Sequence, residues 1–188
     1  EGYPPLRIRG RELEGGQLVI PGNVSSQYVS ALLMIAPILT KGLDLKLTGE
    51  IVSRPYIDLT LHIMHEFGVA AEWTNFDTIS VKPQQYTRRT YTIENDWTAS
   101  SYWYEILALQ DDLDAEVVIS GLKDGSRQGD AAVRYIFSLL GIKTNFARKD
   151  AEGLTDATLT RHTRMLNRMD YDFINHPDLA QTLIAACP

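Results

Sequence analysis

Residues 21–37, PGNVSSQYVSALLMIAP, hold a turn, a polar helix start and an apolar helix. A Pro-Gly pair marks the turn, and apolar residues then recur at helical spacing on one face: Val29, Leu32, Leu33 and Ala36. This spacing predicts a helix over residues 25–36. One capping residue is enough to begin a helix, yet Ser25, Ser26 and Gln27 stand side by side here.

This row of polar residues fits a site for an anion. The first N–H groups of a helix lack partners inside the helix and carry partial positive charge, which attracts phosphate above all. Two hydroxyls and an amide beside them add neutral donors of adjustable direction. The simpler interpretation of this stretch alone is an N-cap, with Ser25 or Ser26 capping the helix and the other serine idle.

A second helix start follows at residues 49–58, GEIVSRPYID. Pro55 suits the first helical position, and Gly68 suits the position just after the last. Ser53 would add a hydroxyl, and Arg54 could pair with a phosphate in a bidentate way, although a cap and a surface arginine also explain these two residues. If the fold brings the two helix starts together, both would face one anion.

The whole sequence alternates short strand-like runs with helical patterns. Strands are predicted at residues 6–10, 17–20, 43–49, 69–73, 78–82, 115–121 and 153–162. Helices are predicted at residues 25–36, 54–68, 98–109 and 126–141, and from Pro177 onward. The chain is therefore expected to be α/β.

The pattern also repeats itself along the chain. Corresponding residues lie 72 or 73 positions apart: Gly49 and Gly121, Asp58 and Asp130, Gly68 and Gly141. Each copy reads helix, strand, helix, strand, strand, which indicates one supersecondary unit present twice. The most polar connector, residues 82–97, predicts a domain boundary that separates residues 1–90 from residues 91–188.

Composition and charge narrow the function classes. The 188 residues are 44% hydrophobic and 22% charged, which is typical of a globular protein, and the net charge of −6 leaves no basic stripe for nucleic acid. Cys187 is the only cysteine and the four histidines lack metal-binding spacing, so no metal is expected. No apolar run reaches the ~20 residues that cross a bilayer, and no signal-peptide pattern opens the sequence. We therefore expect a cytoplasmic protein without a membrane partner.

The two ends of the sequence look cut. Position 1 is not methionine, and the last segment, DLAQTLIAACP, is apolar and helix-like but stops without a polar cap. We therefore expect this chain to be a fragment of a longer protein.

Six segments occur in an order that resembles one protein family: YPPLRIRG, NVSSQYVSALLMIAP, GEIVSRPYIDLTL, DWTASSYW, RQGD and NHPDLAQT. Together, and over nearly all 188 residues, they resemble the middle portion of the 5-enolpyruvylshikimate-3-phosphate synthases. The resemblance implies an inside-out α/β barrel fold, in which each of two domains is made of βαβαββ units and the ligand lies between the domains. This chain would hold the end of the first domain and the start of the second, as two partial domains.

The resemblance also gives roles to single residues. The hydroxyls of Ser25, Ser26 and Ser53 would bind the 3-phosphate of shikimate 3-phosphate, and Gln27 would lie between this substrate and phosphoenolpyruvate. Asp178, in the segment NHPDLAQT, would engage the 5-hydroxyl and accept its proton. From the residues alone, an acid in the first turn of a helix is an ordinary partner of the helix dipole.

Other residues at matching positions receive lesser roles. Tyr56 would lie close to the same substrate. Asp96, Ser100 and Ser101 open the matching helix of the second copy, and we interpret them as capping and hinge residues. Bulky aromatic residues stand where smaller ones are expected, which predicts a bulkier core: Trp97, Tyr102, Trp103 and Tyr104.

The implied reaction transfers the enolpyruvyl group of phosphoenolpyruvate to the 5-hydroxyl of shikimate 3-phosphate and releases phosphate, in the biosynthesis of chorismate. It needs no cofactor, and the full-length enzyme is expected to be a monomer. The family's remaining substrate-binding and proton-donating residues would lie outside residues 1–188, so the isolated chain is expected to be inactive. The alternatives are a UDP-N-acetylglucosamine enolpyruvyl transferase and a non-catalytic module that binds a phosphorylated metabolite.

Overall fold

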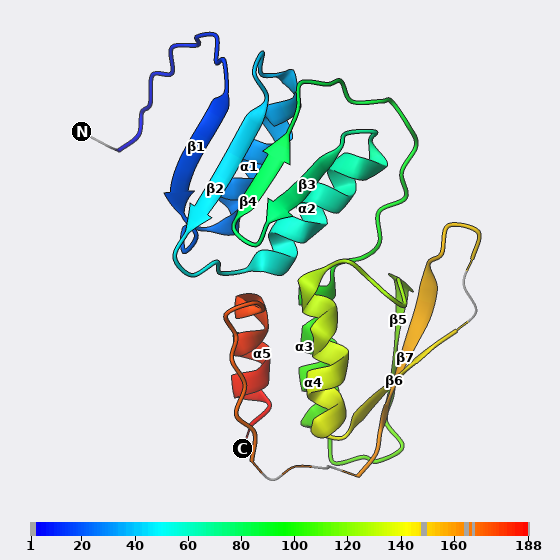
Figure 1. Ribbon diagram of the computed structural model, residues 1–188. Helices are drawn as coiled ribbons and strands as arrows, with labels where there is room; N and C mark the ends of the chain where they lie inside the picture. Colours follow the sequence, from blue (N-terminus) through cyan, green and yellow to red (C-terminus); the bar gives the residue numbers. More distant parts are fainter. Residues whose placement is uncertain (1–2, 148–149, 164–165, 167, 188) are drawn as a thin grey trace.

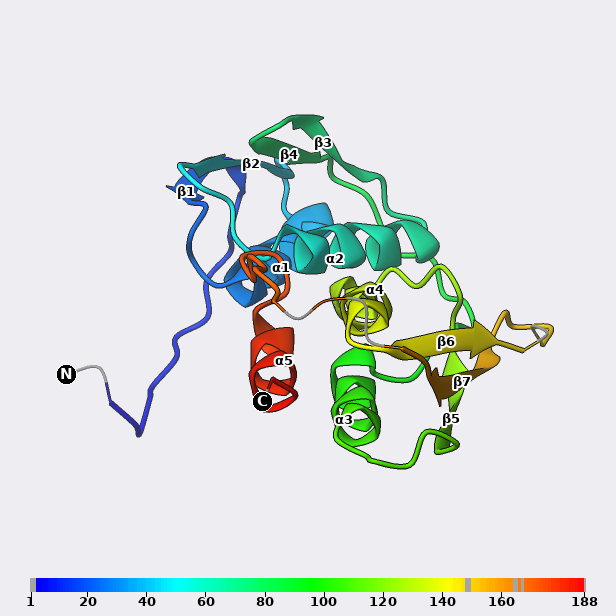
Figure 2. The same cartoon turned by 90° about the horizontal axis from the view of Figure 1, so that it is seen from below.

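The computed structural model describes residues 3–147, 150–163, 166 and 168–187 of the chain. Its described part divides into a unit before the connector and a unit after it, each with a β-sheet covered by helices (Figure 1). The polypeptide that leads into the first strand runs away from the rest of the fold in both views (Figures 1 and 2).

The first unit follows the order βαβαββ. Its elements are β1 (Gly16–Pro21), α1 (Ser26–Ile35), the 3₁₀ turn η1 (Ala36–Ile38), β2 (Leu43–Thr48), α2 (Arg54–Glu66), β3 (Ala71–Asn75) and β4 (Thr78–Val81). The sheet has the order β1-β2-β4-β3, in which β1 and β2 are parallel and β4 is antiparallel to both of its neighbours. Both α1 and α2 lie on one face of this sheet (Figure 2).

The local sequence explains these elements. In β2 the leucines Leu43, Leu45 and Leu47 are buried and the residues between them are exposed, so the strand has one core face. Pro55 stands in the first turn of α2, where its missing N–H is not needed. Gly68 follows the helix at a φ of 83°, a left-handed conformation that glycine adopts without steric cost.

The second unit repeats this order from its first helix onward. Its elements are α3 (Trp97–Ala108), β5 (Glu116–Leu122), the 3₁₀ turn η2 (Gly129–Ala132), α4 (Val133–Leu139), β6 (Ile142–Phe146) and β7 (Thr155–Arg161). The sheet has the order β5-β7-β6 and is antiparallel throughout its described pairs. The 3₁₀ turn η3 (Pro177–Leu179) and α5 (Ala180–Ala185) follow, and α5 lies beside α3.

The repeat that the sequence predicted is confirmed in backbone detail. Gly49 and Gly121 have φ values of 73° and 77°. Gly68 and Gly141 have φ values of 83° and 93°. Each pair therefore marks the same turn in the two copies, because only glycine adopts this conformation freely.

One predicted element is wrong and a second is wrong in part. Residues 6–10 do not form a strand; Leu6 and Ile8 are exposed, and no strand among the described residues pairs with them. Alternation alone cannot hold a strand without a ladder partner. The helix predicted over residues 126–141 begins only at Gly129, as the 3₁₀ turn η2, and becomes α-helical at Val133.

Among the described residues, each unit has its own buried cluster. In the first, the helices pack on the sheet through residues such as Val29, Leu33, Leu45 and Ile57. In the second, Trp97 and Tyr104 are fully buried, as expected for a bulkier core, whereas Tyr102 and Trp103 are 44% and 50% exposed. Half of the predicted aromatic core is therefore on the surface of α3.

Residues 82–96 connect the units without forming a helix or strand. The first part is fastened to the first unit: Thr87 N–H donates to Phe67 O at 2.7 Å, and the Tyr86 hydroxyl to Met34 O at 2.9 Å. The last part is fastened to the second unit, where Asn95 N–H donates to Gly121 O at 2.8 Å.

Candidate functional site

The first unit places two helix starts next to each other. Because β1 and β2 are parallel neighbours, the loops that lead into α1 and α2 leave the sheet at the same edge. Gly22 N–H donates to Thr48 O at 2.7 Å, and Val52 N–H donates to Gly22 O at 3.2 Å. A Cβ at position 22 would lie 2.7 Å from Glu50 O, so glycine permits this close approach. The backbone therefore brings the two starts together, as the anion hypothesis requires.

At the start of α1, Ser25 is the N-cap. Its hydroxyl oxygen accepts one long hydrogen bond of 3.4 Å from Gln27 N–H, and its side chain is exposed. Ser26 is half-buried and Gln27 is exposed, and neither side chain is engaged in a hydrogen bond with the described residues. All three side chains that the sequence singled out can therefore turn toward a ligand.

At the start of α2, Ser53 has a left-handed φ of 54°, the only positive φ of a non-glycine residue in the described ranges. Such a conformation is uncommon outside glycine and tends to occur at functional sites. Its N–H donates to Ile174 O at 2.9 Å, and its hydroxyl does not cap the helix. Ser53 thus keeps its hydroxyl available while its backbone contacts the second unit.

The side chain of Arg54 lies against the β3–β4 hairpin. Its guanidinium lies 4.0 Å above the ring of Trp73 and donates to Phe76 O at 3.2 Å, both in the β3–β4 hairpin. In this conformation Arg54 is therefore not placed to pair with a phosphate beside Ser53. The alternative from the sequence, a surface arginine, describes Arg54 better.

Asp178 reaches the start of α2 from the second unit. It lies in η3 with an exposed carboxylate, and its Oδ2 is 3.1 Å from the Tyr56 hydroxyl. The same hydroxyl lies 2.9 Å from Oδ1 of Asp130. Burial, then the bond and charge of Asp130, then Asp178 raise the pKa of Tyr56, so its phenol stays protonated.

Asp130 is a residue to which the sequence gave no role. It is 1% exposed, and the hydroxyl of Thr98 also donates to its Oδ2. The signals that could have found it are the segment RQGD and its correspondence with Asp58 in the first copy. Nearby, burial lowers the pKa of His176, although the charge of Asp130 opposes this shift.

Of the predicted capping residues of α3, Asp96 is confirmed as the N-cap, whereas the prediction is wrong for Ser100 and Ser101. Asp96 accepts hydrogen bonds from the N–H groups of Thr98 and Ala99, at 2.8 and 3.3 Å. Ser100 and Ser101 are buried in the second turn rather than at the start, and each donates to a backbone carbonyl of the preceding turn. These serines are occupied within the helix, unlike the serines of α1.

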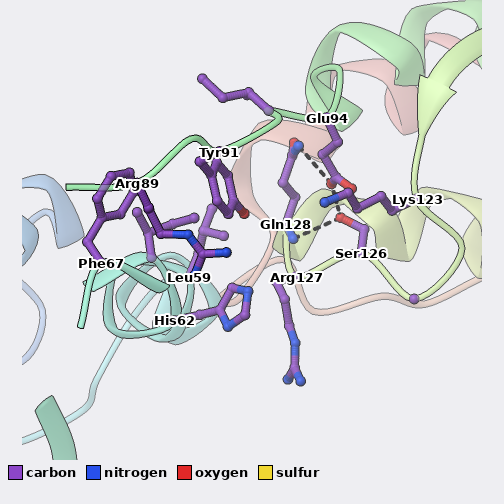
Figure 3. Close-up of a pocket in the computed structure, with 13 residues that line it drawn as sticks. Leu59, His62, Phe67, Arg89, Tyr91, Glu94, Lys123, Ser126, Arg127 and Gln128 are labelled. Carbon is purple, nitrogen blue, oxygen red and sulfur yellow. Dashed lines mark hydrogen bonds between the residues drawn. The ribbon is translucent and has the colours of Figure 1, made fainter. Parts of the chain in front are cut away.

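A separate pocket of about 660 Å³ lies between α2, the connector and the loop after β5 (Figure 3). Leu59 and Phe67 form part of its apolar wall, and Gln128 and Ser126 hold the carboxylate of Glu94 at one side. None of the residues predicted to bind substrate lines this pocket.

The described residues lack both a metal-binding cluster and a membrane-spanning helix. Within them, no group of three or more His, Cys, Asp or Glu side chains is arranged to hold a metal ion. None of their helices is long and apolar enough to cross a membrane.

Solved structures share this fold. Two structures of EPSP synthase from Acinetobacter baumannii superpose with TM-scores of 0.66 and 0.67, at 16% and 17% sequence identity. They cover 94% and 98% of this chain and 39% and 41% of their own chains. The repeated units thus form part of an enolpyruvyl transferase fold.

Sequence comparison gives the family. The family model of EPSP synthase (3-phosphoshikimate 1-carboxyvinyltransferase) matches residues 1–187, and the chain belongs to this family. The 3-phosphoshikimate 1-carboxyvinyltransferase of Bacteroides fragilis is 49% identical over 187 residues, and that of a Sulfurovum species is 35% identical over 185. These matches cover 100% and 97% of this chain but only 44% and 41% of the relatives.

Proposed function

We propose that the complete protein containing this chain transfers the enolpyruvyl group of phosphoenolpyruvate to the 5-hydroxyl of shikimate 3-phosphate. The chain's membership of the family supports this activity, and the relatives it matches are named 3-phosphoshikimate 1-carboxyvinyltransferase. The site adds the chemistry: a pair of neighbouring helix starts suited to a phosphate, and a carboxylate facing them from the other unit.

In this proposal, the hydroxyls of Ser25, Ser26 and Ser53 bind the 3-phosphate, with Gln27 toward phosphoenolpyruvate. Asp178 orients the 5-hydroxyl and takes its proton as the hydroxyl oxygen bonds to C2 of phosphoenolpyruvate. C3 gains a proton in the same addition. The tetrahedral intermediate then loses phosphate together with one proton of its C3 methyl group, and the electron pair of that C–H bond forms the double bond of the enolpyruvyl ether.

The observation that carries the proposal is the 3.1 Å contact between Tyr56 of α2 and Asp178 of η3. These residues are 122 positions apart in the sequence, and the contact puts the proposed base beside the helix start that holds Ser53. If the 3-phosphate binds there, the ring of shikimate 3-phosphate would stay close to the carboxylate of Asp178.

The test is phosphate release by the complete protein given shikimate 3-phosphate and phosphoenolpyruvate. Asp178→Ala should reduce the rate by about 100-fold or more, the range of a lost general base. Asp111→Ala, an exposed residue beyond α3, is the matched control and should keep the wild-type rate. Release that instead requires UDP-N-acetylglucosamine would identify the other enolpyruvyl transferase, and substrate binding without release would indicate a non-catalytic module.

The proposal includes the finer expectations from the sequence. They are a monomeric, cytoplasmic enzyme that needs no cofactor, and a domain boundary near residue 90. The separate buried clusters of the two units support this boundary. The isolated chain should not release phosphate, since it spans only 44% of the length of its Bacteroides fragilis relative.

A further inference from the structure

The Tyr56 hydroxyl stands between two carboxylates but has only one proton to donate. It lies 2.9 Å from Asp130 Oδ1 and 3.1 Å from Asp178 Oδ2. An ionised carboxylate only accepts hydrogen bonds, so the phenol can satisfy one of these partners fully. The direction of this proton decides whether Tyr56 is a hydrogen-bond donor or an acceptor toward the other carboxylate.

The surroundings favour Asp130 as the acceptor. Asp130 is 1% exposed, so its charge depends on protein donors, namely the hydroxyls of Tyr56 and Thr98. Asp178 is exposed and can be solvated by water. The shorter of the two distances also belongs to Asp130. The phenol proton therefore points to Asp130, and a lone pair of the phenol oxygen faces Asp178.

Packing fixes this geometry across the two units. Tyr56 belongs to α2, whereas Asp130 belongs to η2 of the second unit. The chain at Gly129 approaches α2 so closely that a Cβ there would lie 2.7 Å from Pro55 Cβ. The carboxylate of Asp130 is thus held against the phenol by contacts independent of the hydrogen bond.

We propose that Asp130 is a positioning residue for the reaction, acting through Tyr56 on Asp178. When Asp178 takes the proton of the substrate hydroxyl, its new O–H finds an acceptor in the Tyr56 oxygen. The electron pair released from the substrate O–H bond goes into the new C–O bond, and the phenol proton stays on Tyr56 throughout. This role rests on the proposed function, because it assigns Asp178 as the proton acceptor.

The experiment compares Asp130→Asn, Tyr56→Phe and the double variant in the complete protein. The amide of D130N donates to the phenol, which turns the phenol proton toward Asp178 and removes the acceptor that Asp178 needs. We expect kcat to fall about tenfold, because protonated Asp178 loses the acceptor of its O–H while ionised Asp178 gains a donor, with KM within about twofold. The double variant should be no slower than the slower single variant, because both changes disrupt the same interaction between Asp130, Tyr56 and Asp178.

Asp58→Asn is the matched control, since Asp58 occupies the corresponding position of the first copy. Its carboxylate is exposed and accepts from Trp73 Nε1 at 2.7 Å instead of from Tyr56, so kcat should not change. Thermal unfolding establishes that each variant is folded. Tyr56→Phe keeps the aromatic ring and removes only the hydroxyl, so it tests the same role of Tyr56 if D130N folds poorly.

The outcomes separate the two proposals. An active wild-type protein whose kcat is unchanged in D130N and Y56F would overturn the positioning role alone. Independent effects that multiply in the double variant would overturn it too, as would a loss explained wholly by a higher KM. A folded wild-type protein that releases no phosphate would overturn the proposed function, and the positioning role with it.

Discussion

The two copies of the repeated unit begin their first helices in opposite ways. In α1 the cap is Ser25, which is exposed and makes a single long hydrogen bond. In α3 the cap is Asp96, which accepts from two backbone N–H groups. The same position in the fold is thus left open in one copy and closed in the other.

Charge explains what this difference means. A carboxylate at a helix start satisfies the free N–H groups and neutralises their partial positive charge, which stabilises the helix but repels an anion. A serine caps more weakly and leaves the positive end for a phosphate. Paired serines in a sequence therefore do not identify a binding site; the identity of the N-cap residue is the better signal.

The largest expected effect comes from giving the first copy the cap of the second. Ser25→Asp puts a carboxylate beside the proposed phosphate, and two unit charges ~4 Å apart repel by about 4 kcal/mol at an effective dielectric constant of 20. We expect the affinity of the complete protein for shikimate 3-phosphate to fall about a thousandfold, measured by calorimetry. Ser25→Asn, an equally good cap without charge, should lose far less. Equal losses in the two variants would argue that shape, not charge, excludes the ligand.

The next prediction tests whether the buried clusters of the two copies contribute independently to the free energy of unfolding. Leu45→Ala and Leu159→Ala each empty a fully buried position, one in each cluster, and should each cost about 3 kcal/mol of unfolding free energy. Because the sites share no partners, the double variant should lose the sum. Chemical denaturation measures all three. A double variant much more stable than the sum would show that the clusters are coupled.

A smaller effect compares the caps themselves. Asp96→Ala should lower the unfolding free energy by about 1 kcal/mol, since it leaves two backbone N–H groups without a partner. Ser25→Ala should cost about 0.5 kcal/mol or less, because its single bond is long. The same denaturation measurement checks both, and a reversed order would contradict the distinction between an open and a closed start.

The smallest effect is expected at Arg54. Its cation–π contact with Trp73 lies on the surface and is worth about 0.5 kcal/mol, and its guanidinium also donates to Phe76 O. Arg54→Ala should therefore leave the affinity for shikimate 3-phosphate within about threefold of the wild type, since 0.5 kcal/mol corresponds to little more than twofold. A tenfold loss would mean that this side chain swings to the phosphate when the ligand binds.

The sequence predicted elements where a local cause decides them. The alternation of leucines over residues 43–47 and the turns at Gly68 and Gly141 were enough for strands, helix ends and the repeat. Residues 6–10 failed because strand formation depends on a partner elsewhere. The direction of Arg54 and the burial of Asp130 depend on long-range contacts, with Trp73 and with Tyr56, which no local pattern encodes.

The connector has a mechanical consequence for any opening between the units. Arg89 donates a hydrogen bond of 2.7 Å to Glu66 O of the first unit and forms an ion pair of 2.9 Å with the Glu66 carboxylate, and Glu94 accepts from Gln128 of the second unit at 2.9 Å. Only five Cα–Cα steps separate these anchors, and they reach at most roughly 18 Å when fully extended. While both sets of contacts persist, this short segment limits the separation of the two units where it joins them. The units can therefore rotate relative to each other but cannot separate by a large translation.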